Sequence, residues 1–399
     1  MPCVEWVRDE FRPAGECVIH VLIDTSVYRA NPRRDAPEFR ALARLARAGV
    51  VQLHVPRYVE REVVSQQTHD LKMQIAAVKT AARTILRRTT SGELRAYAEE
   101  TMRKSDEAER VCATRMEVEF QTWVRHCKGI IHPVRPHHGE RVTEDYFAGS
   151  PPFRSAKRRE DFPDSFIWHT ALDIVAEHDA LTLIAADEAL TGAAASLGNI
   201  SCRKTLAEFI QADECQDALD DLTPEVVSEN VDRIKRLLPS MKGDLLDMLN
   251  RGIVNALAGR VVTHGSIPDD NNQARILSVG GADAVAFGFD DIEHYGDGEI
   301  GVNFDTTIEC LVYFALDRGA YYGLSELSGV SVAGELNEHY LDAEQDLQVR
   351  VEGVLSIITD AKALERDDLT DGDLLQLVRE ADYDVDVMET AVSAPGGDY

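Results

Sequence analysis

The sequence predicts an α/β domain with a parallel sheet, followed by an α+β domain with a mainly antiparallel sheet. Up to about residue 212, short apolar runs alternate with segments of helical periodicity, which is typical of a parallel sheet flanked by helices. Later runs alternate apolar and polar residues, as strands with one buried face do. A length of 399 residues also allows two separate cores. We therefore expect a first domain at residues 1–212 and a second at 213–399.

Uninterrupted apolar runs predict the strands of the first domain. A strand that helices cover on both faces has no polar side, so its sequence does not alternate. The expected strands are CVIHVLI at 17–23, VVQLHV at 50–55, LTLIAA at 181–186 and a brief fourth, NISC, at 199–202.

Helices are expected between these strands, where apolar residues recur at helical spacing. They lie at 36–48, from Pro56 onward, and at 165–178. Residues from about 70 to 128 predict a helical insertion of two long helices, broken near 89–92. Residues 129–164 have an irregular, proline-rich pattern.

Three histidines occur in this irregular stretch: His132, His137 and His138. Clustered histidines raise the question of a metal site, but no cysteines accompany them at zinc-ligand spacing. We therefore expect these three side chains at the surface.

The second domain is predicted to begin with two helices, near 224–238 and 241–258, before its alternating runs. A short helix is expected to open at 369–373, and residues 382–386 (DYDVD) alternate like a strand, unlike a calcium-binding loop. We find no glycine-rich phosphate loop, nucleophile elbow or zinc spacing in this half. Its sequence therefore predicts no catalytic site.

Charge divides the chain unevenly. Residues 211–399 hold 12 basic and 40 acidic residues, which accounts for the entire net charge of −28, while the first 210 residues hold 30 of each. An acidic surface repels phosphate backbones, so the second half is a poor candidate for nucleic-acid binding. Three interpretations of that half stay open: a module for self-association or a protein partner, a negative surface that restricts which nucleic acids approach, or a structural extension.

Several classes of protein are disfavoured by composition. The sequence lacks an apolar run of about 18 residues, as a membrane span requires. Its N-terminal stretch, MPCVEWVRDEFRPAGE, contains acids and no continuous apolar segment, unlike a secretory signal. The seven cysteines are scattered and form no CxxC pair, which is typical of reduced thiols. We expect a cytoplasmic protein.

Four acids are candidates for a shared site. Asp24 and Asp187 follow strands directly, Asp164 begins a helix, and Glu62 lies on the helix after the second strand. Each has an ordinary explanation alone, as a helix cap or an exposed helix residue. Gathered at one sheet edge, however, carboxylates repel one another and need a cation. Oxygen ligands without cysteine or histidine suit Mg²⁺ or Mn²⁺.

The order of these acids resembles that of PIN-domain nucleases. The matching features are Asp-Thr-Ser at the end of the first strand, Val55-Pro56-x-x-Val59-x-x-Glu62, the helix led by Asp164, and Asp187 after a strand. The segment from Phe147 to Phe166 also resembles the GxPPF…KKxEFPDA signature of a bacterial PIN-like family of uncharacterised function. The resemblance covers about residues 17–210.

This resemblance implies a PIN fold, a divalent metal ion, and single-stranded RNA, less often DNA, as substrate. It also implies an endoribonuclease that acts as a toxin or an antiphage-defence effector. Asp24, Glu62, Asp164 and Asp187 would form the catalytic, metal-binding pocket, with Thr25, Ser26 and Asp161 supporting it. Alternatives are a DNA-directed nuclease of the same fold and a non-catalytic PIN-like scaffold. The family usually has Ser or Thr where this chain has Ala185, which weakens the match there.

Basic and aromatic side chains near the acids are candidates for contacts with nucleic acid. We expect four basic residues before Asp161 to hold substrate phosphates: Arg154, Lys157, Arg158 and Arg159. Arg33 and Arg34 are weaker candidates. Aromatic side chains could stack on bases, but core packing is the commoner fate; these are Trp123, Tyr146, Phe147 and Trp168.

Overall fold

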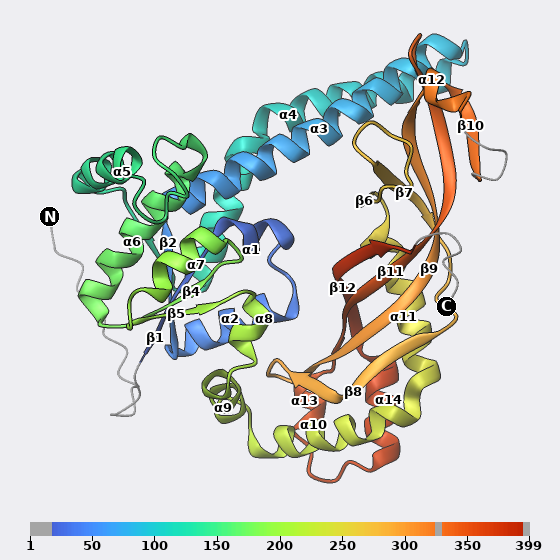
Figure 1. The fold of residues 1–399 in the computed structure, drawn as a ribbon. Coiled ribbons are helices and arrows are strands. Elements are labelled where there is room, and N and C mark those ends of the chain that lie inside the picture. The colour runs from blue at the N-terminus through green and yellow to red at the C-terminus, as the bar shows by residue number, and fades with distance from the viewer. Residues whose placement is uncertain (1–17, 324–328, 394–399) are drawn as a thin grey trace, which may run out of the picture. The chain divides into compact units, whose positions relative to one another are not determined.

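The computed structural model describes residues 18–323 and 329–393 and divides into two compact units, Met1–Ala218 and Leu219–Tyr399 (Figure 1). The N-terminal stretch with Cys3 and Cys17 lies outside the described residues, as does the first residue of the strand expected at 17–23. Among the described helices, none is both long and apolar enough to cross a membrane.

Within the described residues, the sheet of the first unit consists of five parallel strands in the order β3-β2-β1-β4-β5. Side chains from its central strands, including Leu22, Leu53 and Leu183, are fully excluded from water. This burial on both faces explains why the strands appear in the sequence as apolar runs, and the predicted parallel sheet is confirmed. The strands are β1 (Ile19–Ile23), β2 (Val51–Pro56), β3 (Ile130–His132), β4 (Leu181–Ile184) and β5 (Ile200–Arg203).

Helices flank this sheet. The helix α2 contacts the strand β2 and the helix α8, and the helix α6 contacts the strand β4 and the helix α5. The α-helices of the first unit, apart from the long pair α3 and α4, are α1 (Thr25–Ala30), α2 (Pro37–Ala48), α5 (Pro136–Ala148), α6 (Phe162–His178), α7 (Glu188–Ala195), α8 (Leu206–Ile210) and α9 (Asp213–Asp221), the last of which crosses the division between the units.

Two long helices, α3 (Arg57–Arg88) and α4 (Gly92–His126), pack against each other as a hairpin (Figure 1). The three residues between them fall at the break expected near 89–92. The helix α3 contacts β2, the strand that directly precedes it, and continues without a break to Arg88.

Part of the irregular stretch at 129–164 is regular in the structure. The short strand β3 pairs with β2, and α5 follows it with Pro136 in its first turn. Three residues are too few for a period to show in a sequence, so β3 was not predicted. The expectation that all three histidines of this stretch lie at the surface was wrong: His138 is 1% exposed and His132 is partly buried.

The second unit is built on a seven-stranded sheet whose strand pairs are antiparallel. Its long strands β9 and β11 pair along their whole length, and alternate residues of β9, such as Ile308, Cys310 and Val312, are fully buried. The predicted antiparallel sheet is therefore confirmed. The strands are β6 (Val261–Thr263), β7 (Gln273–Val279), β8 (Val285–His294), β9 (Glu299–Asp317), β10 (Val330–Glu335), β11 (Tyr340–Ile358) and β12 (Asp382–Val392).

Helices complete the core of this unit. The helix α11 packs against β7 and β12, and α10 packs against α13 and α14. The strand at β12 agrees with the alternation of residues 382–386, whereas β10 had no prediction. The helices are α10 (Glu225–Leu237), α11 (Lys242–Leu257), α12 (Arg318–Tyr321), α13 (Ala361–Leu364) and α14 (Asp371–Glu380).

Candidate active site

Asp24 lies where β1 ends and α1 begins. Its backbone N–H donates to the carbonyl of Ile184 at 2.9 Å, which joins the carboxyl ends of β1 and β4. Its side chain caps α1: Oδ2 accepts from the Ser26 backbone N–H at 3.2 Å and from Ser26 Oγ at 2.7 Å. The carboxylate is 7% exposed. Ser26 thus holds the Asp24 side chain in place, because a buried carboxylate must find donors.

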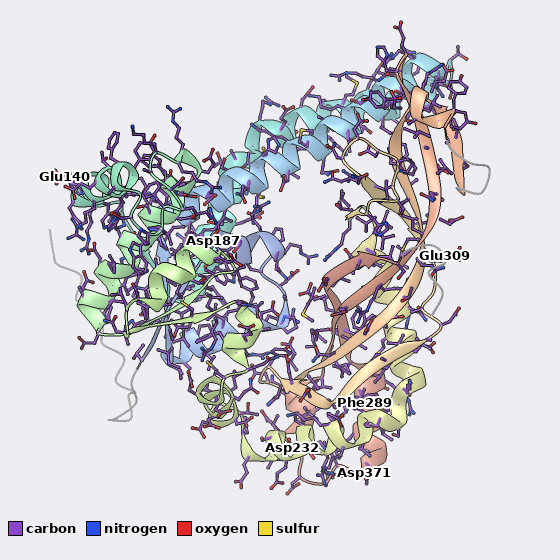
Figure 2. The ribbon with its side chains drawn as sticks, in the orientation of Figure 1. Glu140, Asp187, Asp232, Phe289, Glu309 and Asp371 are labelled. Carbon is purple, nitrogen blue, oxygen red and sulfur yellow. The ribbon has the colours of Figure 1, made fainter. Side chains whose placement is uncertain are left out.

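Asp187 follows β4 and caps α7. Its Oδ1 accepts from the backbone N–H groups of Ala189 at 2.8 Å and Leu190 at 3.1 Å. Both bonds go to one oxygen, and the other oxygen, Oδ2, accepts from the guanidinium of Arg154. Asp187 is partly exposed and is labelled in Figure 2.

Asp164 lies in the first turn of α6, after Pro163. The pKa of its carboxyl is raised to about 7, first by burial and then by the carboxylates of Asp187 and Asp24, while Arg154 acts in the opposite direction. A carboxylate feels such repulsion only from charges close by, because solvent screens distant ones. Asp24, Asp164 and Asp187 are therefore electrostatic neighbours at one edge of the sheet, although they are far apart in sequence.

Glu62 lies two turns into α3. Its Oε2 accepts from Thr25 Oγ1 at 2.8 Å, and Gln66 Nε2 lies 3.5 Å from its Oε1. Thr25 directly follows Asp24, so this bond attaches the helix of Glu62 to the end of β1. Thr25 and Ser26 each donate to one acid of the set, which gives both hydroxyls a positioning role in the structure.

Asp161 is fully buried before α6 and accepts from Arg154 twice. The backbone N–H of Arg154 donates at 2.9 Å and its Nη1 donates at 2.7 Å, while Arg158 Nε lies 3.5 Å away. Arg154 therefore bridges Asp161 and Asp187. The sequence predicts that Arg154 contacts substrate phosphates. In this structure its positive charge is paired with the carboxylates of Asp161 and Asp187 instead.

The other residues expected to contact nucleic acid differ in their surroundings. Lys157 and Arg159 are exposed and lie close to Asp161 in the sequence. By contrast, Arg34 is 8% exposed and its guanidinium lies over the Phe120 and Trp123 rings at 5.3 and 5.8 Å, so it does not face solvent.

Most of the aromatic candidates pack inside the unit. Trp168 is 7% exposed, Trp123 contacts Tyr28 and Phe39, and Tyr146 contacts Phe153 and Phe162. Only Phe147 of the four is exposed, at 60%. Core packing is thus the commoner fate.

Ala185 is fully buried between β4 and Asp187, and its backbone N–H donates to the carbonyl of Arg203 at 3.0 Å. The hydroxyl that the PIN-like pattern usually has at this position is missing, so no side-chain donor reaches the acids from here. The carboxylate of Asp187 is nevertheless held by the N-terminus of α7.

The four acids offer carboxylate oxygens, which are hard metal ligands. Their negative charges are not fully balanced by positive side chains. Their ligand atoms are not among the groups of three within 4.8 Å that the described residues form; both of those groups contain histidines. Carboxylates that repel one another draw together when a divalent cation binds. Carboxylate oxygens of this kind suit Mg²⁺ or Mn²⁺.

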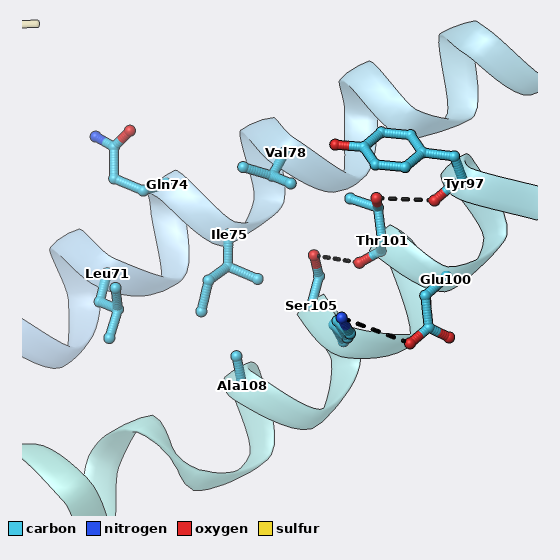
Figure 3. A pocket seen from close by; sticks show the side chains of 10 residues that line it. Leu71, Gln74, Ile75, Val78, Tyr97, Glu100, Thr101, Ser105 and Ala108 are labelled. Atoms are coloured by element: carbon cyan, nitrogen blue, oxygen red, sulfur yellow. Dashed lines mark hydrogen bonds and ion pairs between the residues drawn. The ribbon is translucent and has the colours of Figure 1, made fainter. Parts of the chain in front are cut away.

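A separate hollow of about 600 Å³ lies between α3 and α4 (Figure 3). Its lining is mainly apolar, from residues such as Leu71, Ile75 and Val78, with Glu100 and Lys104 on one side. None of the four acids lines it. The hollow therefore belongs to the helical hairpin and not to the candidate active site.

Comparison with known proteins gives one match. Residues 21–189 match the model of a family described as PIN domain. This range begins within β1 and ends just after Asp187, so it contains all four acids. Neither the curated proteins nor the solved structures contain a match.

Proposed function

Residues 21–189 of this chain are a PIN domain, a nuclease-type fold, and from this premise we propose that the chain is a divalent-metal-dependent nuclease that cleaves single-stranded RNA internally. Asp24, Glu62, Asp164 and Asp187 are its proposed catalytic residues, and Mg²⁺ or Mn²⁺ its cofactor. The residues proposed to position these acids are Thr25, Ser26 and Asp161.

The observation that carries the proposal is the electrostatic strain at Asp164. The pKa of this carboxyl is raised to about 7 by burial and by the charges of Asp187 and Asp24. Such an arrangement costs stability, because each added negative charge opposes the others. Strained acidic groups are typical of functional sites, where a ligand supplies the missing charge.

A bound divalent ion would activate water as a nucleophile and stabilise the charge that develops on the phosphodiester. The chain's own residues prepare the site for this. Ser26 and the N-terminus of α7 fix one oxygen each of Asp24 and Asp187, and the second oxygen of Asp187 pairs with Arg154. Glu62, held by Thr25, completes the negative pocket.

RNA as the substrate rests on the family resemblance, together with the exposed cations next to the acids. Lys157 and Arg159 are exposed and precede Asp161 closely in the sequence, and we propose that they contact the phosphate backbone. Arg154 can join them if a metal ion takes over the neutralisation of Asp187. A cytoplasmic location accords with the five cysteines that are free in the described chain.

The proposal is tested by incubating labelled single-stranded RNA and single-stranded DNA with the full chain and Mn²⁺, Mg²⁺ or EDTA. We expect metal-dependent internal cleavage of RNA, reduced at least about 100-fold in Asp24→Asn and Asp164→Asn. These changes keep the side-chain shape and remove one negative charge each. Glu144→Gln, an exposed acid on α5, is the matched control and should keep full activity.

Each alternative gives a different result. Cleavage of DNA with RNA left intact would establish a DNA-directed nuclease. Folded wild-type chain that cleaves neither nucleic acid under any metal condition would favour a non-catalytic scaffold. Growth arrest on expression, abolished by Asp24→Asn, would support a role as a toxin or antiphage-defence effector.

A further inference from the structure

A row of histidines crosses one face of the parallel sheet. His20 on β1 and His54 on β2 approach with 2.9 Å between Nδ1 and Nε2, and His54 Nδ1 lies 2.8 Å from Nε2 of His132 on β3. The register explains this arrangement, since His54 lies opposite Leu22 on one side and Ile130 on the other, and side chains two apart on a strand share a face. Three neighbouring strands thus present imidazoles to the same space.

A fourth histidine reaches the row from α6. His178, the last residue of that helix, stacks on His20 with 4.0 Å between ring centroids. Ligand nitrogens of His20, His54 and His178 all lie within 4.8 Å of one another. His54 is fully buried and His178 is exposed, so the cluster opens to solvent on one side.

We propose that His20, His54 and His178 bind one transition-metal ion of the zinc class, with His132 orienting His54. The site is separate from the acids, because Asp164 and His178 lie at opposite ends of α6, about 20 Å apart at 1.5 Å per residue. Three imidazoles with one open, solvent-facing position suit Zn²⁺, Co²⁺ or Ni²⁺, whereas Mg²⁺ prefers oxygen.

The distances require little rearrangement. Two imidazole nitrogens on one tetrahedral zinc ion stand about 3.3 Å apart, given bonds of about 2.0 Å. The 2.9 Å between His20 and His54 therefore needs to open by only a few tenths of an ångström. His178 is at a helix end and exposed, so it can adjust to the third position.

The hydrogen bond to His132 has the form that metal sites use. With Nε2 of His54 on the ion, its Nδ1–H donates to His132 Nε2, which fixes the tautomer and the ring orientation.

A second histidine group in the same unit provides a contrast. His137 and His138 both face Asp173, and His138 Nε2 lies 2.9 Å from its Oδ2. Arg135 Nη1 lies 3.1 Å from the same oxygen, and the Arg135 backbone N–H donates to His138 Nδ1. These groups already satisfy one another, and the arginine repels a cation.

The test is a Co²⁺ titration of the chelator-treated full chain in excess Mg²⁺, which occupies oxygen sites. We expect one equivalent of Co²⁺ to bind with the intense visible absorption of tetrahedral coordination, and Zn²⁺ to displace it. His178→Gln and His20→Gln should weaken binding more than about 100-fold, and His132→Gln by about 10- to 100-fold. His69→Gln, an exposed histidine on α3, is the matched control and should bind like wild type.

Thermal unfolding of the metal-free protein checks folding separately. Because His178 is exposed, the His178→Gln variant should have the same thermal midpoint as the wild type. Zn²⁺ should raise that midpoint in the wild type and in His69→Gln, but not in His178→Gln. The proposal is overturned if the folded wild type binds no Co²⁺. It is equally overturned if His178→Gln and His20→Gln bind normally, or if Asp24→Asn abolishes the signal, which would place the ion at the acids. Nuclease activity is not a readout, so this result is independent of the proposed function.

Discussion

At the scale of single residues, hydrogen-bond donors on neighbouring elements hold the acids of the first unit in position. Ser26 and Thr25 donate from the turn after β1, and the α7 N-terminus donates to Asp187. Asp164 differs from these because burial and the charges of Asp187 and Asp24 raise its pKa. The protonation state of Asp164 therefore affects both the proposed site and the stability of the fold.

Asp164 makes the stability of the metal-free protein depend on pH. The folded chain keeps a proton on this carboxyl up to about pH 7, whereas the unfolded chain loses it near the ordinary pKa of 3.8. Between these values the native state binds more protons, so the contribution of Asp164 to the free energy of unfolding falls as pH rises. At pH 8 Asp164→Asn should be more stable than wild type by about 1 to 2 kcal/mol, a value reduced because the group is partly exposed.

Urea unfolding of both proteins at pH 5 and pH 8, in EDTA, measures this difference. At pH 5 the advantage of the variant should be smaller, because this pH lies only partway from the ordinary pKa of 3.8 to the folded pKa of about 7. Adding Mg²⁺ at pH 8 should stabilise the wild type and reduce the advantage of the variant. An Asn variant that is less stable at pH 8 would show that Asp164 makes favourable contacts as an anion.

Arg154 combines a structural role with a proposed functional one. Its guanidinium bridges Asp161, which is fully buried, and Asp187. Arg154→Gln leaves the Asp161 charge with one backbone donor and the more distant Arg158. We expect a loss of about 1 to 3 kcal/mol in unfolding free energy, as for a buried charged group that loses its partner.

Arg154→Lys is the control that separates charge from geometry. Lysine keeps the positive charge but cannot bridge two carboxylates with a planar fork, so it should recover only part of the loss in thermal unfolding. The double variant Arg154→Gln with Asp161→Asn should be more stable than Arg154→Gln alone. If Arg154→Gln unfolds like wild type, the ion pair contributes nothing and Asp161 is stabilised by other means.

At the scale of elements, the sequence predicted best where burial leaves a periodic signal. The strands β1, β2 and β4 are apolar runs covered by helices, and the alternation of β9 reflects its single buried face. The acids at the ends of β1 and β4 could be grouped because parallel strands that share a sheet end at the same edge. Glu62 required only the further assumption that α3 begins directly after β2.

Other features lack such a signal. β3 is three residues long, and β10 is a mostly exposed edge strand whose side chains need not be apolar. The partnership of Arg154 with Asp187 joins residues 33 positions apart, and the histidine row joins four separate elements. Contacts of this kind depend on register and side-chain direction, which composition does not encode.

At the scale of the whole molecule, two units carry different charge. The first 210 residues are neutral, and the net charge of −28 lies beyond them. Each unit has its own sheet and its own buried residues. One interpretation of the acidic unit is that it restricts access of nucleic acid to the proposed nuclease by long-range repulsion, without requiring a particular contact.

This interpretation predicts the behaviour of a shortened chain. A fragment of residues 1–212 ends between α8 and α9 and contains the whole PIN match. It lacks the entire net charge of −28, so it should cleave RNA faster than the full chain at low salt. The difference should shrink as salt rises toward about 0.5 M, because screening removes repulsion between separated charges.

Circular dichroism must first show that the fragment is folded, and the fragment with Asp24→Asn is the matched control for background cleavage. If the folded fragment is no faster than the full chain at any salt concentration, repulsion by the acidic unit does not control the nuclease, and a role in self-association or partner binding becomes the better explanation of residues 213–399.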